Sequence, residues 1–171
     1  MVVFARPHPF TLVLGGVMAA VGEFLRYWGV AYAGSLTRVT GGVGAPEVVV
    51  AGPFAYVRNP LYLGNIILYV GVGIMSNALF PWLVLVAAFY FAFQYYRIVL
   101  LEEEFLGGTF GTAYADFSKS VPRFLPRLTR YTNEAQARQR PDWSAAVRSE
   151  KRTLQAIGLV FVLLIALWLW S

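Results

Sequence analysis

The chain has 171 residues, of which 58% are hydrophobic and only 13% are charged, and its formal net charge is +5 at pH 7. Soluble domains are about 45–50% apolar and about 25% charged, so this composition excludes a water-soluble domain of the same size. The chain has no Cys and one His, which excludes disulfides, thiolate chemistry and a histidine metal cluster, and we expect no bound metal.

Four hydrophobic segments approach the roughly 20 residues that a helix needs to cross the ~30 Å hydrocarbon core of a bilayer. They cover about residues 10–33, 61–80, 81–101 and 154–170. The second and third are separated only by the turn-forming Ser76-Asn77-Ala78 and Pro81, which predicts a tight helical hairpin. We therefore expect an all-α integral membrane protein, a single domain over residues 1–171 with about four transmembrane helices.

The first of these segments contains two charged residues, Glu23 and Arg26. With the length of the segment, they argue against a signal peptide and favour a retained helix. Because they are three residues apart, they lie on one helix face, where an ion pair can form with Arg26 reaching the interface. A structural pair and a functional intramembrane site both fit this spacing.

The distribution of Lys and Arg predicts the orientation of the chain. Of 14 such residues, Arg6 precedes the first segment and Arg26 lies within it, which leaves 14 − 2 = 12 in residues 34–60 and 97–152. In a membrane protein such an excess marks the inner leaflet rather than a nucleic-acid partner. We expect both segments on the cytoplasmic side and both termini outside. Because nearly all of these residues are Arg, a prokaryotic inner (plasma) membrane is favoured.

Two polar segments remain for chemistry at the cytoplasmic face. The first begins with the Gly-rich residues 41–46 and continues into Val48-Val49-Val50, which predicts a flexible turn and a short extended stretch. The glycines lack the G-x-G-x-x-G order of a phosphate loop. The second runs from Glu102 to about Arg130, and the polar residues after it lead to Asp142-Trp143, a typical start for an interfacial helix.

Asn59-Pro60 predicts the beginning of the second transmembrane helix. Asn is among the best N-cap residues and Pro is favoured at the first helical position. A helix N-terminus at the cytoplasmic face also offers N–H groups and a positive dipole end to a carboxylate, with Arg58 beside it. Arg58 is equally explained as a positive-inside anchor.

Three consecutive carboxylates, Glu102-Glu103-Glu104, follow the third hydrophobic segment. If that helix ends near Gly107-Gly108, they lie where the helix dipole disfavours negative charge by roughly 0.3–1 kcal/mol each. A cation should compensate them. Pairing with Arg123 or Arg127 is one interpretation, and binding of a positively charged or polyhydroxyl ligand is the other.

Two ordered motifs at residues 52–64 and 102–126 carry a resemblance to a known family. The first reads G-P-F-A-Y-V-R-N-P-L-Y-L-G, and the second combines E-E-E-F-L, F-G, Tyr114 and V-P-R-F-L-P. Together they resemble the isoprenylcysteine carboxyl methyltransferase family, whose superfamily also includes the membrane phospholipid N-methyltransferases. The resemblance implies an integral membrane enzyme that binds S-adenosylmethionine at the cytoplasmic face, between the two motifs.

The resemblance also implies which residues hold the cofactor. Arg58 is assigned by the helix N-terminus argument above, and the others are carried over by position: Phe54, Asn59, Pro60, Leu61 and Tyr62 from the first motif, and Glu102 and Glu103 from the second. Many members have His where this chain has Asn59, and Asn does not titrate near neutrality, so we expect no acid–base role there. In the prenylcysteine enzymes an Arg just before the Glu pair meets the substrate carboxylate. In this chain Ile98 occupies that position, and Arg97 lies one residue before it.

The sequence thus predicts an S-adenosylmethionine-dependent methyltransferase that acts on a lipid or lipophilic acceptor from the bilayer. The acceptor atom and the oligomeric state stay open. Two alternatives also stay open: a membrane reductase of the sterol-reductase kind, which would use a nicotinamide cofactor, and a non-catalytic membrane scaffold.

Overall fold

The computed structural model describes residues 4–34 and 47–170, and within them the chain is helical and contains no strand. Five α-helices follow one another: α1 (Pro9–Ala33), α2 (Pro60–Ser76), α3 (Trp82–Phe110), α4 (Thr112–Ser120) and α5 (Trp143–Trp170). Short 3-10 helices form at Gly52–Ala55 and Glu134–Ala137. The predicted all-α class is confirmed.

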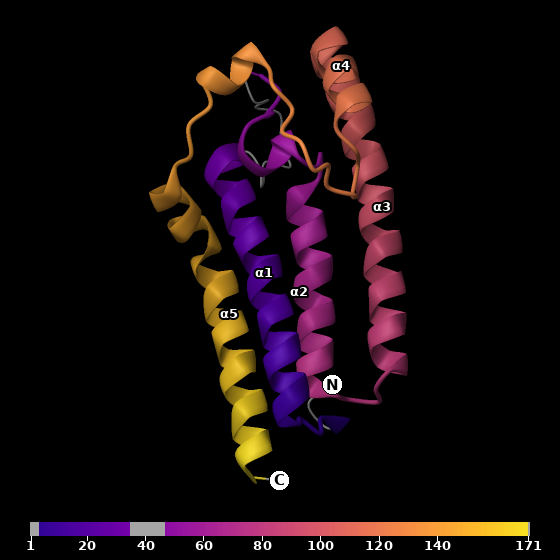
Figure 1. Cartoon of the computed structure of the whole chain (residues 1–171), viewed down its shortest axis with the longest axis vertical. Coiled ribbons are helices and arrows are strands. Elements are labelled where there is room, and N and C mark those ends of the chain that lie inside the picture. Colours follow the sequence, from indigo (N-terminus) through magenta and orange to yellow (C-terminus); the bar gives the residue numbers. More distant parts are fainter. Residues whose placement is uncertain (1–3, 35–46, 171) are drawn as a thin grey trace.

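Four of the helices form an elongated array in which α5 packs on α1, α1 on α2 and α2 on α3 (Figure 1). The polar segments, including α4, gather at one end of the array, and both chain ends lie at the other. This arrangement agrees with the predicted order of crossings. It also places the two sequence motifs at the same end of the molecule.

Three helices, α1, α3 and α5, are long and apolar enough to cross a membrane. The apolar α2 has 17 residues, a rise of about 26 Å, so it is slightly shorter than the hydrocarbon core. About four transmembrane helices is therefore consistent with the fold.

The helices and the hydrophobic segments do not have the same limits. The second helix ends at Ser76, before the segment limit at residue 80, because Asn77 adopts the left-handed conformation (φ 48°) that terminates a helix. The third runs from Trp82 to Phe110, past the expected end near Gly107-Gly108, so the three glutamates lie before its last two turns. The last begins at Trp143 and continues through the hydrophobic segment that starts at residue 154, because the polar residues before 154 are themselves good helix formers.

Helices α1 and α2 pack closely because glycines on each helix face the backbone of the other. A Cβ added at Gly22 would lie 2.5 Å from the Leu68 amide nitrogen, and one at Gly71 would lie 2.5 Å from the Ala19 nitrogen. Gly15 faces the Gly71 carbonyl in the same way. Small residues therefore allow the two backbones to approach, the usual means of packing helices in a membrane.

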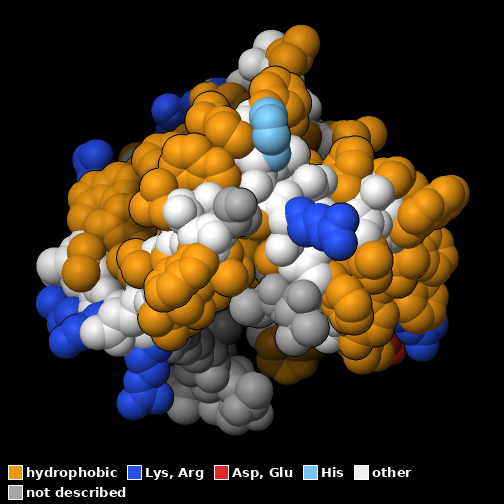
Figure 2. All heavy atoms as spheres, turned by 90° about the horizontal axis from the view of Figure 1, so that it is seen from below, with side chains coloured by type: hydrophobic (Ala, Val, Ile, Leu, Met, Phe, Trp, Pro, Cys, Tyr) orange, Lys and Arg blue, Asp and Glu red, His pale blue; other side chains and the backbone are white. Residues whose placement is uncertain are grey.

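The hairpin between α2 and α3 is bound to the N-terminal segment. The Arg6 N–H donates to the Ser76 carbonyl (2.9 Å), and Asn77 Nδ2 donates to the Arg6 carbonyl (3.0 Å). Seen from this end, the molecule presents a largely hydrophobic surface with scattered Lys and Arg (Figure 2). The hairpin and the N-terminus thus share one end, as the charge distribution predicts.

Helix α5 is attached to α1 by polar contacts. Arg26 Nη1 contacts Glu23 Oε2 (2.9 Å), and Arg26 Nη2 contacts Glu150 Oε2 (2.7 Å). Nearer the polar end, the Tyr27 hydroxyl donates to the Trp143 carbonyl, and the two rings lie 5.4 Å apart. The predicted Glu23–Arg26 pair forms, and it extends to a second carboxylate on α5.

The predicted helix start at Asp142-Trp143 is confirmed. Asp142 Oδ1 accepts hydrogen bonds from the Ala145 N–H and the Ser144 hydroxyl, both at 2.8 Å. These bonds cap the N-terminus of α5, and they hold the pKa of Asp142 below its usual value.

The predicted extended stretch before the first motif is found at Val48–Val50, whereas the glycine-rich turn at 41–46 lies outside the described residues. Gln139 completes the hydrogen bonding of the stretch: its Oε1 accepts from the Val50 and Ala51 N–H groups, and its Nε2 donates to the Val48 carbonyl. One glutamine side chain therefore takes the place of a neighbouring strand.

Candidate functional site

The first motif forms a 3-10 turn whose aromatic side chain points into the interior. Gly52 has φ 60°, which favours glycine, and a Cβ there would collide with the Tyr32 ring. Phe54 is buried in a cluster at the polar end of the molecule. The other buried members of this cluster are Ala33, Val50, Tyr114, Phe117 and Val121.

Helix α2 begins at Pro60, as predicted, but Asn59 does not cap it. The Asn59 side chain makes no capping hydrogen bond, and its Nδ2 donates instead to the Arg123 carbonyl (3.2 Å). The capping prediction is wrong because this carboxamide connects α2 to the second motif. The N-terminal turn of α2 keeps its dipole and lies at the polar end.

The end of the second motif runs along the first and is hydrogen-bonded to it. The Arg58 N–H donates to the Pro122 carbonyl, and the Arg127 N–H donates to the Tyr56 carbonyl, both at 2.9 Å. The Tyr131 N–H donates to the Ala55 carbonyl at the same distance. Backbone pairing thus joins two motifs that are far apart in sequence.

Glu103 is the centre of an ion network between the motifs. Arg123 binds it through two nitrogens, with Nη2 2.6 Å from Oε2 and Nε 3.0 Å from Oε1. Arg58 Nη1 lies 3.1 Å from Oε1. The Glu103 side chain is 12% exposed, so its charge is compensated in a partly desolvated place. Of the two partners predicted for the glutamates, Arg123 is found and Arg127 is not, since Arg127 Nη1 donates to the Ser120 carbonyl.

Tyr114, from α4, lies against this network. Its side chain is buried beside Arg58 and Glu103. Burial, reinforced by the negative charge of Glu103, raises the pKa of the Tyr114 hydroxyl above its usual value. Tyr114 therefore stays neutral and can donate a hydrogen bond at physiological pH.

Glu102 directly precedes Glu103 on α3. It interacts with the hydroxyl of Tyr62 on α2. The Tyr62 ring lies 5.2 Å from the Tyr95 ring, and these two aromatics fill the contact between α2 and α3. The Arg123 guanidinium lies 5.6 Å from the Tyr96 ring centroid, a cation–π contact on the outside of this pair.

An open cleft of about 810 Å³ lies between the end of α3, α4 and the two motifs. Arg58 and Glu103 are the predicted cofactor residues that line it, and Arg123, Glu104 and Lys119 add three more charges. The remaining lining residues are Gly107, Gly111, Thr112, Tyr114, Ala115 and Ser118. The cleft therefore presents cations and carboxylates a short distance apart.

The other predicted site residues lie around this cleft rather than on its surface. Phe54 and Pro60 are buried, and Leu61 packs partly buried against the Phe54 cluster. Arg97 is exposed on α3 and is absent from the lining of the cleft. Sequence reasoning named Glu104 as part of the glutamate cluster but did not place it in the cofactor site. It did not select Thr112 or Lys119, because charged and hydroxyl residues near a helix end have an ordinary solvent-facing explanation.

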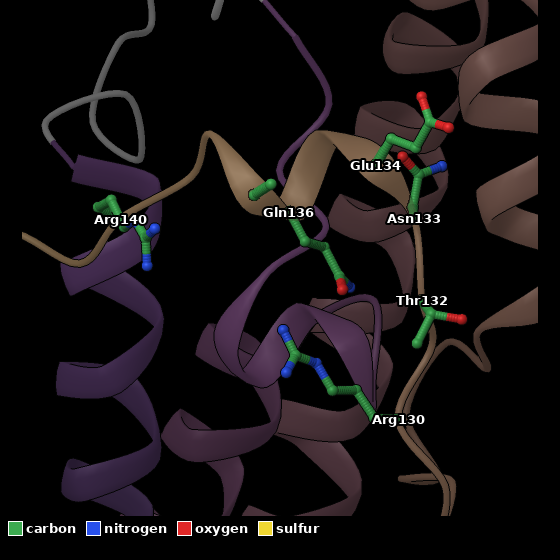
Figure 3. Close-up of a pocket in the computed structure, with 7 residues that line it drawn as sticks. Arg130, Thr132, Asn133, Glu134, Gln136 and Arg140 are labelled. Atoms are coloured by element: carbon green, nitrogen blue, oxygen red, sulfur yellow. The ribbon is translucent and has the colours of Figure 1, made fainter.

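A second cleft of about 590 Å³ lies over residues 130–140 (Figure 3). Arg130 and Gln136 point toward each other across it, and Arg140 lies beside the end of α1. Gln136 Nε2 already donates to the Val50 and Tyr131 carbonyls. The polar groups here serve mainly to hold the polar segments together, so the first cleft is the better candidate site.

The first cleft suits a ligand that carries both signs of charge. Arg58 lines the cleft and supplies a guanidinium for a negatively charged group. Glu104 and Lys119 are exposed at the rim. A carboxylate–ammonium zwitterion with a sulfonium centre, such as S-adenosylmethionine, matches this donor set. Among the described residues no group of three or more His, Cys, Asp or Glu could hold a metal ion.

Comparison with known proteins agrees with the geometry. The profile of the phospholipid methyltransferase family matches residues 10–113, more than half of the chain. The chain belongs to this family. The match includes the first motif, the α2–α3 hairpin and the three glutamates.

Two curated bacterial proteins are similar to the chain. The cobalt-zinc-cadmium resistance protein CzcN of Cupriavidus metallidurans is 29% identical over 146 residues, 85% of this chain and 60% of its own length. The nickel-cobalt-cadmium resistance protein NccN of Alcaligenes xylosoxydans xylosoxydans is 31% identical over 123 residues, 72% of this chain and 52% of its own length. The chain thus spans little more than half of these relatives. No solved structure matches it significantly.

Proposed function

We propose that this membrane protein transfers a methyl group from S-adenosylmethionine to a lipid or lipophilic acceptor. The observation that carries the proposal is the cleft of mixed charge between the two motifs, at the end where the apolar segments of α2 and α3 stop. Membership of the phospholipid methyltransferase family supports the reaction class.

The charged groups in and beside the cleft have separate roles in this proposal. Arg58 binds the cofactor carboxylate, and Glu104 binds its ammonium group. Glu102 accepts hydrogen bonds from the ribose hydroxyls. Glu103 orients Arg58 and Arg123 through their ion pairs. Phe54, Asn59, Pro60 and Leu61 support these groups from behind.

For methyl transfer the protein needs only to position the reactants and exclude water. When bound, S-adenosylmethionine supplies an electrophilic methyl group. The methyl–sulfur bond breaks as the bond to an N, O or S atom of the acceptor forms, so the residues around the cleft must align the acceptor and exclude water. Most of the rate enhancement then comes from positioning and electrostatics. Asn59 holds no proton for this step, in keeping with its bond to the Arg123 carbonyl.

The acceptor reaches the site through the bilayer in this proposal, and the cofactor reaches it from the cytoplasm. Residues 34–60 and 97–152 contain 12 of the 14 Lys and Arg residues, which supports a cytoplasmic position for the polar end in the inner membrane. Tyr62, Tyr95 and Tyr96 lie where α2 and α3 meet below Glu102. Such rings offer one apolar face and one polar edge to a lipid headgroup.

The test is methyl transfer in a defined mixture. Purified protein, S-adenosylmethionine labelled on its methyl group and native membrane lipids are incubated, and lipid-extractable label is measured. Label in lipid is expected. Label only in water-soluble molecules would refute the lipid acceptor, and no transfer together with nicotinamide binding would favour the reductase alternative. No binding of either cofactor would favour a scaffold.

The Glu102→Gln variant distinguishes a cofactor-binding role of Glu102 from a purely structural one. Loss of a charged acceptor should weaken binding of S-adenosylmethionine by the ~1.5–3 kcal/mol typical of a charged hydrogen bond. Helix-end electrostatics alone predict slightly higher stability and unchanged affinity. Calorimetry on the purified variant, with its thermal midpoint as the folding control, distinguishes the two outcomes.

A further inference from the structure

Two leucines on the loop between α4 and the 3-10 helix at Glu134–Ala137 are unusually exposed. Leu125 is 80% exposed and Leu128 is completely exposed. They belong to residues 124–128, here named the Leu loop. A large apolar side chain that faces outward from the polar end of a protein requires an apolar environment of its own.

The Leu loop is held in this position. The residue before it, Arg123, binds Glu103 through its side chain and Asn59 Nδ2 through its carbonyl. Inside the loop, the Arg127 N–H donates to the Tyr56 carbonyl, and Arg127 Nη1 donates to the Ser120 carbonyl. The exposure of the leucines is therefore a fixed feature of the fold.

The same bonds set the level of the loop relative to the membrane. Glu103 belongs to the first charged turn of α3 after its apolar segment, and Asn59 directly precedes α2. Figure 1 shows the chain after α4 descending between α2 and α3 to the level at which α2 begins. The Leu loop thus lies where the two helices enter the hydrocarbon.

Aromatic side chains mark the same level on other helices. The rings of Trp28 and Tyr56 lie 6.4 Å apart, and Tyr27 packs on Trp143 at the start of α5. Trp and Tyr gather at membrane–water interfaces. On α3, Phe105 is also exposed. The surroundings of the Leu loop are therefore interfacial.

We propose that the Leu loop is a membrane anchor, in which Leu125 and Leu128 insert into the interfacial layer of the bilayer. The flanking Arg130 is exposed, and arginines near a membrane surface are attracted to anionic lipid headgroups. The occupant of this surface is lipid, in continuity with the lipid-facing side of α3. Through Arg123, the anchor connects the bilayer to the Glu103 network of the cleft.

Site-directed spin labelling tests the anchor without any cofactor, so its outcome is independent of the proposed methyl transfer. The chain has no Cys. Single-Cys variants Leu125→Cys and Leu128→Cys carry a nitroxide in the protein reconstituted into phosphatidylethanolamine–phosphatidylglycerol vesicles. Phe89→Cys, 77% exposed in the apolar first half of α3, is the hydrocarbon reference, and Lys119→Cys on α4 is the aqueous reference.

Collision rates of the nitroxide with oxygen and with a water-soluble nickel chelate give the result. We expect oxygen-to-nickel ratios at both Leu positions several-fold above that of Lys119→Cys and closer to that of Phe89→Cys. A ratio like that of Lys119→Cys would overturn the proposal by placing the loop in water. Low accessibility to both reagents would also overturn it, because protein and not lipid would then cover the loop.

A double variant provides a second measurement. Leu125→Gln/Leu128→Gln should lose part of the rise in thermal midpoint that the wild-type protein gains on transfer from detergent to vesicles. Leu125→Ile/Leu128→Ile should retain it. An equal gain in wild type and both variants would contradict a membrane anchor.

Discussion

Glu103 has more influence on the site than any other single carboxylate, because two arginines from separate segments meet on it. Arg58 precedes α2, and Arg123 follows α4. Glu103 was expected to contact the cofactor directly, but its oxygens are engaged by these guanidinium groups. Its role in the proposed site is to position Arg58 at the cleft.

Glu103→Gln should therefore destabilise the fold strongly. It leaves Arg58 and Arg123 partly buried without their shared carboxylate, and breaking a buried ion pair costs ~3–5 kcal/mol, with the lower end expected because Arg123 is partly exposed. Glu104→Gln on the exposed neighbour is the matched control and should change little. Thermal unfolding in detergent measures both, and equal midpoints for the two variants would contradict the network.

For individual residues, the sequence predicts side-chain contacts between residues close in sequence better than contacts between distant residues. The spacing of Glu23 and Arg26 predicts their ion pair, but no local signal identifies Glu150, which lies 124 residues after Arg26 and joins the same cluster. Asn59 is a good N-cap by type, yet its side chain bonds the Arg123 carbonyl, a partner that only the tertiary fold supplies. Likewise, the His8 side chain accepts a hydrogen bond from the Phe10 N–H and caps α1.

At the scale of elements, the packing of α1 on α2 depends on glycine. A Cβ at Gly22 would lie 2.5 Å from the Leu68 nitrogen and 2.6 Å from the Gly64 carbonyl oxygen, so Gly22→Ala must separate the helices. We expect a loss of about 1–3 kcal/mol, as for other overpacked interiors.

The matched control is Gly158→Ala on α5, where an added Cβ would meet no heavy atom within 4 Å. It should leave stability unchanged or slightly higher, since Ala favours helix more than Gly does. Thermal midpoints of the two variants in the same detergent provide the comparison. If the thermal midpoint of Gly158→Ala fell as much as that of Gly22→Ala, close packing would not explain the effect.

The N-terminus of α5 should respond to pH through Asp142. Because the folded pKa of Asp142 is depressed by bonds from Ala145 and Ser144, its stabilisation is fully present above the unfolded pKa of about 4 and is lost as the pH falls through the folded pKa. Asp142→Ala should thus lower the thermal midpoint at neutral pH. This difference from wild type should disappear in strong acid.

Asp142→Asn is the control, because its amide oxygen can accept the Ala145 bond at every pH. Its midpoint should vary less with acid than that of the wild type. A difference between wild type and Asp142→Ala that persists unchanged below the folded pKa would show that the cap does not act through the carboxylate.

Helix boundaries are less predictable than helices. Hydrophobic length identifies all four apolar helices, but α5 begins at Trp143, eleven residues before its hydrophobic segment, because a polar segment that forms helix precedes it. Likewise α3 passes Gly107-Gly108 without interruption. Glycines end a helix only where the chain turns, and here the turn comes at Gly111, with φ 54°.

At the scale of the whole molecule, the fold separates a hairpin end from a motif end. Phe80 lies at the hairpin and Lys119 on α4 lies among the motifs. The charge distribution predicts that Phe80→Cys is labelled from outside the cell and Lys119→Cys from the cytoplasm. A membrane-impermeant maleimide on intact cells and on inverted vesicles measures this. Labelling of both residues from one side would contradict the topology.

Binding of S-adenosylmethionine tests the central claim most directly. Purified protein in lipid nanodiscs is titrated by calorimetry with S-adenosylmethionine and, separately, with a reduced nicotinamide cofactor. The mixed-charge cleft and the family membership predict saturable binding of the first at one site per chain and no binding of the second. Absence of S-adenosylmethionine binding by folded protein, or saturable binding of the nicotinamide alone, would contradict the assignment as a methyltransferase.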